Sequence, residues 1–63
     1  MKLLELLTTI ESSQKVKIVT TKKYFVESGY CLELLAQSFY LDFFVTNISI
    51  SDEYLIISIK GRN

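Results

Sequence analysis

The spacing of apolar residues switches twice from a helical to a strand-like period within 63 residues, and this alternation is the strongest constraint on the fold. Near the N-terminus, apolar residues recur at positions i, i+3, i+4 and i+7, which predicts one apolar stripe on a helix over about residues 2–11. That stripe consists of Leu3, Leu6, Leu7 and Ile10. The same spacing predicts a second helix from about residue 30 to between 38 and 40, with Ser28 as its N-cap. Its apolar residues are Leu32, Leu35, Ala36 and Phe39.

Two other segments alternate apolar and polar residues, as half-buried strands do. Residues 15–27 predict a β-hairpin, although one long bent strand is an alternative because the segment has no Gly, Asn or Pro at its turn. Residues 44–59 predict a clearer hairpin, with its turn at 51–53. The residues expected to face the helices from this second hairpin are Phe44, Ile48, Ile50, Leu55, Ile57 and Ile59.

The order helix, hairpin, helix, hairpin predicts an α+β fold in which both helices pack on one face of an antiparallel sheet. We expect residues 1–63 to form a single compact domain, because no linker, repeat or low-complexity stretch interrupts the pattern. Disorder is not expected, since the chain is 49% hydrophobic and has a formal net charge of zero.

This arrangement places a second set of apolar residues on the sheet face that the helices leave open. The set consists of Phe43, Val45, Tyr54 and Ile56. Burying such side chains is worth roughly 1.5 to 3 kcal/mol each, so pairing two of these faces predicts a homodimer. Alternatively, the sheet curls and these residues join a single core.

The composition excludes the common catalytic and metal sites. The chain has no His and one Cys, so neither a Ser-His-Asp nor a Cys-His nucleophile system exists in it, and the usual zinc ligands are missing. Cys31 is expected to be a small buried side chain. Asp52 and Glu53 are adjacent in a turn, so they do not converge as a general acid and base do. We therefore expect a non-enzymatic protein without cofactor or metal.

Aromatic residues concentrate between positions 24 and 44. Phe25, Phe39 and Phe44 are expected to fill the junction between hairpin and helix. Tyr30 and Tyr40 are the candidate interface anchors, because tyrosine combines a large apolar body with a polar tip.

Charges are ordered along the chain, although their sum is zero. Four lysines predict a basic patch, which defines the alternative function of a small nucleic-acid-binding regulator. They are Lys15, Lys17, Lys22 and Lys23. The acidic residues instead suit a basic groove on a protein partner. They are Glu27, Glu33, Asp42, Asp52 and Glu53.

No stretch approaches the length of about 20 apolar residues that a membrane span needs, and Glu5 interrupts the only apolar run near the N-terminus. We therefore expect the protein in the cytoplasm of a bacterial host cell.

Four segments carry a resemblance to a known group of proteins. They are Lys2-Leu3-Leu4-Glu5-Leu6-Leu7, Val16-Lys17-Ile18, Glu33-Leu34-Leu35 and Ile48-Ser49-Ile50-Ser51-Asp52-Glu53-Tyr54-Leu55-Ile56-Ile57. This arrangement resembles the small proteins of phages and mobile elements of Gram-positive bacteria, some of which are type II anti-CRISPR proteins. The resemblance implies a stoichiometric inhibitor of a host defence nuclease such as Cas9, acting through surface contacts. The zero net charge differs from the strongly negative charge of inhibitors that mimic DNA, so it favours binding through the shape of the protein surface.

The leading hypothesis is thus a phage-encoded protein-interaction module, with a nucleic-acid-binding regulator and a self-associating structural subunit as alternatives. The residues expected to contact the partner are Tyr30, Tyr40, Phe43, Tyr54, Ile56, Glu33, Asp42, Asp52 and Glu53.

Overall fold

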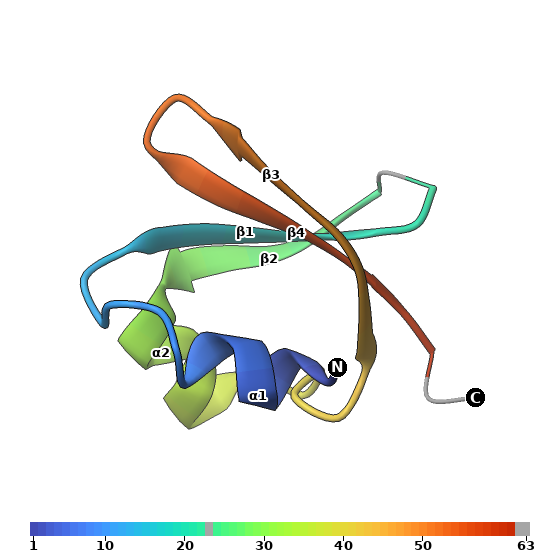
Figure 1. The fold of residues 1–63 in the computed structure, drawn as a ribbon, viewed down its shortest axis with the longest axis horizontal. Helices are drawn as coiled ribbons and strands as arrows, with labels where there is room; N and C mark the ends of the chain where they lie inside the picture. The colour runs from blue at the N-terminus through green and yellow to red at the C-terminus, as the bar shows by residue number, and fades with distance from the viewer. Residues whose placement is uncertain (23, 62–63) are drawn as a thin grey trace.

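The computed structural model describes residues 1–22 and 24–61, so the predicted patch residue Lys23 lies outside the described residues. The elements along the chain are α1 (Leu3–Leu7), β1 (Lys15–Thr20), β2 (Phe25–Tyr30), α2 (Cys31–Gln37), β3 (Phe44–Ser51) and β4 (Tyr54–Lys60). Both short helices lie on the same side of a four-stranded sheet (Figure 1). The α+β class and the order of elements are as predicted, and each predicted hairpin forms as an antiparallel pair.

The sheet is mixed, so the prediction of a purely antiparallel sheet is wrong. Its strand order is β2-β1-β4-β3, and the two hairpins join through a parallel pairing of β1 with β4. Ile18 pairs with Ile57 in this register, and Val16 pairs with Leu55. The two most buried strands, β1 and β4, lie at the centre of the sheet, and each is hydrogen-bonded to a neighbouring strand along both of its edges.

Helix α1 is shorter than predicted, but its apolar stripe is confirmed. Leu3 and Leu7 are fully buried, and Leu6 and Ile10 pack against the core from its margin. After Leu7 the chain continues in turns, and the hydroxyl groups of Thr8 and Thr9 donate hydrogen bonds to backbone carbonyls three residues earlier. Such side-chain bonds compete with regular helical geometry.

Helix α2 faces the core with a side that only partly matches the predicted stripe. It buries Cys31 and Leu34, and Leu35 packs against the core as predicted. The other predicted residues are exposed: Leu32 is 61% exposed, Ala36 is exposed, and Phe39, beyond the helix end, is 88% exposed. The helix begins directly after β2, with Tyr30 rather than Ser28 at the N-cap. The backbone N–H of Cys31 also donates to the carbonyl oxygen of Gln14 at 2.8 Å, which places Cys31 beneath the loop that leads into β1. This direct connection fixes the rotation of the helix.

The core lies between the helices and the sheet. It consists of Leu3, Leu7, Val16, Ile18, Cys31, Leu34, Ile57 and Ile59. Phe25 and Phe39 were expected to fill the junction beside it, but both are exposed. The aromatic residues that do pack against the core are Tyr40 and Phe43.

Phe43 and Val45 pack on the core side, so the prediction that they share the opposite sheet face with Tyr54 and Ile56 is wrong. The N-terminus of the chain fixes their position. Leu3 N–H donates to the carbonyl oxygen of Phe43 at 2.8 Å, and Val45 N–H donates to that of Met1 at 2.9 Å. An irregularity in the β3–β4 register between Val45 and Asn47 then shifts the alternation of the strand. Val45, not Phe44, therefore occupies the inward position.

The second half of β3 extends past the helices. Ile48 and Ile50 pair with Ile57 and Leu55 and therefore lie on the helix side of the sheet, as expected. They are nevertheless 44% and 78% exposed, because the helices do not cover this end of the hairpin. The structure thus leaves an apolar part of β3 in contact with solvent.

The turn between β3 and β4 supports a prediction about stability. Asp52 has a φ of +55°, in the left-handed region where a β-branched side chain is strained by about 1–2 kcal/mol. Asp52→Val should therefore lower the free energy of unfolding by about that amount relative to Asp52→Gly at the same position. Urea denaturation of the two variants provides the comparison, and equal midpoints would contradict the turn geometry described here.

Candidate interaction surface

The sheet face opposite the helices carries two rows of side chains that cross the strands. One row consists of Tyr30, Lys15 and Tyr54, which are register neighbours on β2, β1 and β4. The adjacent row consists of Ser28, Lys17, Ile56 and Ser49, and it runs across all four strands. We call these seven residues the open face. Their side chains point away from the core because residues opposite one another on neighbouring strands share a face of the sheet.

Tyr54 lies at the centre of the open face, beneath two lysines. The Nζ atoms of Lys15 and Lys17 lie 5.9 and 5.5 Å from the centroid of its ring. Both distances are within the range of a cation–π interaction, which is worth about 0.5–1 kcal/mol at exposed sites. Tyr54 and Ile56 are half-buried as a result, because the aliphatic parts of lysine side chains cover apolar neighbours.

Lys15 also forms an ion pair with Glu53, with 3.1 Å between Nζ and Oε2. The hydrogen bond that Lys15 Nζ donates to the Glu53 carboxylate, and then the negative charge of that carboxylate, hold the pKa of Lys15 above its usual value. The Gln14 side chain donates to the backbone carbonyl of Glu53 at 3.0 Å, which joins the β3–β4 turn to the start of β1. Positive and negative charge therefore lie side by side at this end of the open face.

Glu53→Gln is expected to lower the pKa of Lys15 towards its usual value, because the variant loses the carboxylate. The Glu53 side chain is 79% exposed and that of Lys15 is 38% exposed, so solvent screens the pair and the unfolding free energy near neutral pH should change little. A raised lysine pKa stabilises the folded state below the unfolded-state pKa, and this stabilisation disappears only as pH rises through the folded-state pKa. NMR titration of the Lys15 ammonium tests the prediction, and an unchanged pKa in the variant would contradict the ion pair.

The structure brings together five of the nine residues that the sequence predicted to contact a partner. Tyr30, Tyr54 and Ile56 lie on the open face, and Asp52 and Glu53 form the turn at its end. Glu33 lies nearby, at the start of α2, where its Oε1 accepts a hydrogen bond from the backbone N–H of Tyr30 at 3.0 Å. This carboxylate therefore caps the helix.

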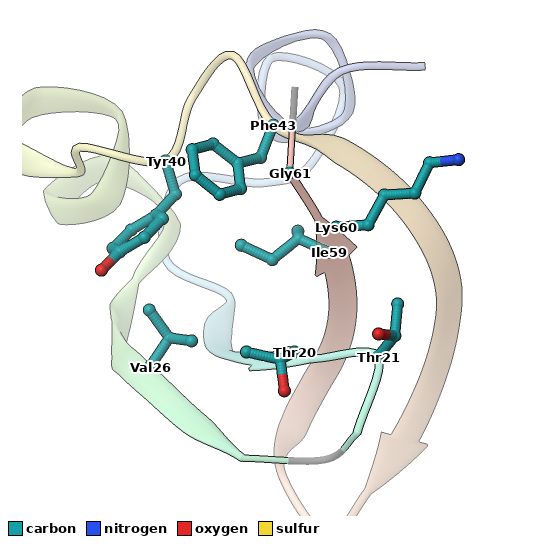
Figure 2. A pocket seen from close by; sticks show the side chains of 8 residues that line it. All are labelled: Thr20, Thr21, Val26, Tyr40, Phe43, Ile59, Lys60 and Gly61. Atoms are coloured by element: carbon teal, nitrogen blue, oxygen red, sulfur yellow. The ribbon is translucent and has the colours of Figure 1, made fainter. Parts of the chain in front are cut away.

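The other predicted contact residues lie elsewhere in the fold. Tyr40 and Phe43 form an edge-to-face pair, with ring centroids 5.1 Å apart, and Asp42 is half-buried in the same connection. The two rings form one wall of a cavity of about 200 Å³, whose opposite side includes Thr20 and Val26 (Figure 2). This volume is below the 300–1,000 Å³ typical of ligand pockets, and both rings pack against the core.

The predicted lysine patch is divided between two places. Lys15 and Lys17 are neighbours on the open face, and Lys15 is ion-paired with Glu53. Lys22 lies in the turn after β1, at the opposite end of the strand. The lysine pattern in the sequence predicts nucleic-acid binding for Lys15 and Lys17, but the structure places both beside Tyr54 and Ile56. The sequence contains a signal for that position, because Lys15 and Lys17 alternate with the buried Val16 and Ile18 and therefore point to the opposite face of the sheet.

Cys31 is a buried side chain, as expected. Its thiol donates to the backbone carbonyl of Leu7 at 3.1 Å, and burial raises its pKa above the usual value. Among residues 1–22 and 24–61, no group of three or more His, Cys, Asp or Glu side chains is placed to hold a metal ion.

None of the helices in the described part of the chain is long and apolar enough to cross a membrane. No protein-family model, no curated protein and no solved structure matches this chain. The assignment of a function therefore depends on the residues of the open face.

Proposed function

We propose that this chain is a non-enzymatic protein-interaction module that binds a partner protein through its open face. The observation that carries the proposal is the row Tyr30, Lys15, Tyr54 beside Ile56, on a sheet face that neither helix covers. Protein interfaces are enriched in tyrosine and combine an apolar centre with a polar rim. The open face has this composition, with Ile56 and Tyr54 at its centre and Ser28 and Ser49 on the outer strands.

The kind of charge on this face favours a protein over a nucleic acid. Lys15 is paired with Glu53, so this end of the surface presents both signs, whereas phosphate is contacted by positive charge. The lysines also cover the ring of Tyr54, which reduces the area on which a base could stack. A partner with complementary acidic and basic side chains suits the surface better.

The partner class that we propose is a bacterial defence nuclease such as Cas9, inhibited stoichiometrically. This step rests on the resemblance of the sequence to small phage proteins and on the zero net charge, which suits binding by surface shape. The protein acts in this proposal by occupying a surface of the nuclease in the cytoplasm of the host cell.

Affinity capture at physiological salt tests the proposal. Immobilised wild-type protein should retain a partner protein, and the double variant Tyr30→Ala/Ile56→Ser should not, because it removes two apolar contacts from the open face. Leu32→Ala is the matched control, since Leu32 is 61% exposed on α2, away from that face. Capture of no protein, or equal loss with Leu32→Ala, would refute the proposed function. Retention of nucleic acid that declines steeply with salt would support the regulator instead.

A cleavage assay tests the proposed partner separately. Guide-loaded Cas9 should lose DNA cleavage at a one-to-one molar ratio of wild-type protein and keep it with Tyr30→Ala/Ile56→Ser. Cleavage that persists at large molar excess would remove Cas9 as the partner.

A further inference from the structure

Strand β3 forms one edge of the sheet and carries features that natural proteins usually avoid at such an edge. The N-terminal residues pair with the beginning of the strand, at Phe44 and Val45. Residues 46–51 are all exposed, and the whole strand Phe44–Ser51 contains no charged residue and no proline. Charged side chains, prolines and short lengths normally protect edge strands from pairing with other chains. The opposite edge, β2, carries Glu27 and continues directly into α2. The β3 edge is therefore the one suited to accept another strand.

The order of residues in β3 is symmetric about Ser49. Isoleucines stand on either side of it at positions 48 and 50, and small polar residues, Asn47 and Ser51, stand one position further out. If two copies of β3 pair in antiparallel fashion about Ser49, each Ile48 lies opposite the Ile50 of the other copy. Asn47 then lies opposite Ser51, and Ser49 lies opposite itself. Every cross-strand pair is thus matched in polarity, and no like charges meet.

The backbone of β3 is also oriented for this register. Ser51 and Tyr54 flank the two-residue turn and pair with each other. Residues that flank such a turn direct their hydrogen-bonding groups towards one another, and alternate residues of an antiparallel strand direct theirs outward. Counting back from Ser51, the outward groups belong to Ile50 and Ile48, the two residues that face one another in the symmetric pairing.

We propose that two copies of this chain associate through antiparallel pairing of their β3 strands, centred on Ser49, to form a continuous eight-stranded sheet. The association covers Ile48 and Ile50, which are 44% and 78% exposed in the single chain. A standard stable interface buries about 800 Å² of each partner, whereas the whole accessible surface of this chain is 4282 Å². The pairing of residues 47–51 buries less than the standard interface area. We therefore expect the dimer to dissociate on dilution. This interface lies at the edge of the sheet, so the open faces of both copies remain accessible on the same side.

Sedimentation equilibrium over a range of protein concentrations tests the pairing, with Ser49→Lys as the diagnostic variant. Ser49 is exposed in the single chain, so the substitution should leave the fold intact, as circular dichroism would verify. In the dimer it places two like charges directly opposite one another, which is destabilising. We expect a concentration-dependent dimer for the wild type and a dissociation constant at least about tenfold higher for Ser49→Lys.

Two further variants test whether the two β3 strands pair in this register. Asn47→Lys introduces the same charge on the same face but opposite Ser51, so it should weaken the dimer much less. An equimolar mixture of Ser49→Lys and Ser49→Glu should form a heterodimer that neither variant forms alone. A wild-type monomer at all concentrations would overturn the proposal, as would a dimer that Ser49→Lys does not weaken. Neither result affects the proposed binding of a partner protein by the open face.

Discussion

Ile57→Ala is expected to lower the free energy of unfolding by about 2–5 kcal/mol, the range measured for removing a large aliphatic side chain from a core. Ile57 is fully buried at the centre of the sheet, where it pairs with Ile18 on one side and with Ile48 on the other. A domain of this size rarely has more than about 3–5 kcal/mol of stability in total. Much of the variant should therefore be unfolded at room temperature, as circular dichroism and urea denaturation would detect.

Leu32→Ala is the control for this prediction, because it also shortens an aliphatic side chain but at a position that is 61% exposed. Surface substitutions of this kind usually change stability by less than about 0.5 kcal/mol. If Ile57→Ala and Leu32→Ala had similar unfolding midpoints, the placement of β4 at the centre of the sheet would be wrong.

Tyr54→Ala is expected to weaken binding of the partner protein at least about 30-fold, which corresponds to the 2 kcal/mol that defines an interface hot spot. The ring of Tyr54 lies at the centre of the open face and positions Lys15 and Lys17 over it. Its removal takes away both an apolar contact and the support of two lysines. Isothermal titration of the partner recovered by affinity capture measures the effect.

Tyr24→Ala provides the matched control for Tyr54→Ala. Tyr24 is 68% exposed and lies just before β2, at the end of the hairpin away from Tyr54. We expect its removal to change the affinity less than about threefold. A comparable loss in both variants, or no loss with Tyr54→Ala in a folded protein, would contradict the role of the open face.

The local features of the fold were predictable because they depend on neighbouring residues. The spacing of Leu3 and Leu7 identified the buried side of α1, and the alternation through Ile57 and Ile59 identified the last strand. Each hairpin pairs segments that are adjacent in the chain, so its turn and period were enough to predict it.

The parallel pairing of β1 with β4 was not predictable in the same way, because it joins segments about 39 residues apart, such as Lys15 and Tyr54. The rotation of α2 depends on the backbone hydrogen bond from Cys31 to Gln14, which no periodicity reveals. The inward position of Val45 likewise depends on its bond to Met1 and on the irregularity that follows it.

The candidate site was predictable only in part for the same reason. Tyr30, Tyr54 and Ile56 were recognised by residue type and strand alternation, but their meeting on one face requires the β2-β1-β4 order. That order also brought Lys15 and Lys17 into the site. Tyr40 and Phe43 are aromatic like the tyrosines of the open face, and only the path of the chain after α2 places them against the core.

Cross-saturation NMR on the protein labelled at its isoleucine methyl groups, in complex with the captured partner, shows which surface of the protein contacts that partner. Irradiation of the partner should attenuate the methyl signal of Ile56, on the open face, and leave that of Ile10, on the helix side, unchanged. Attenuation of Ile10 with Ile56 unaffected would place the partner on the helices and contradict the account.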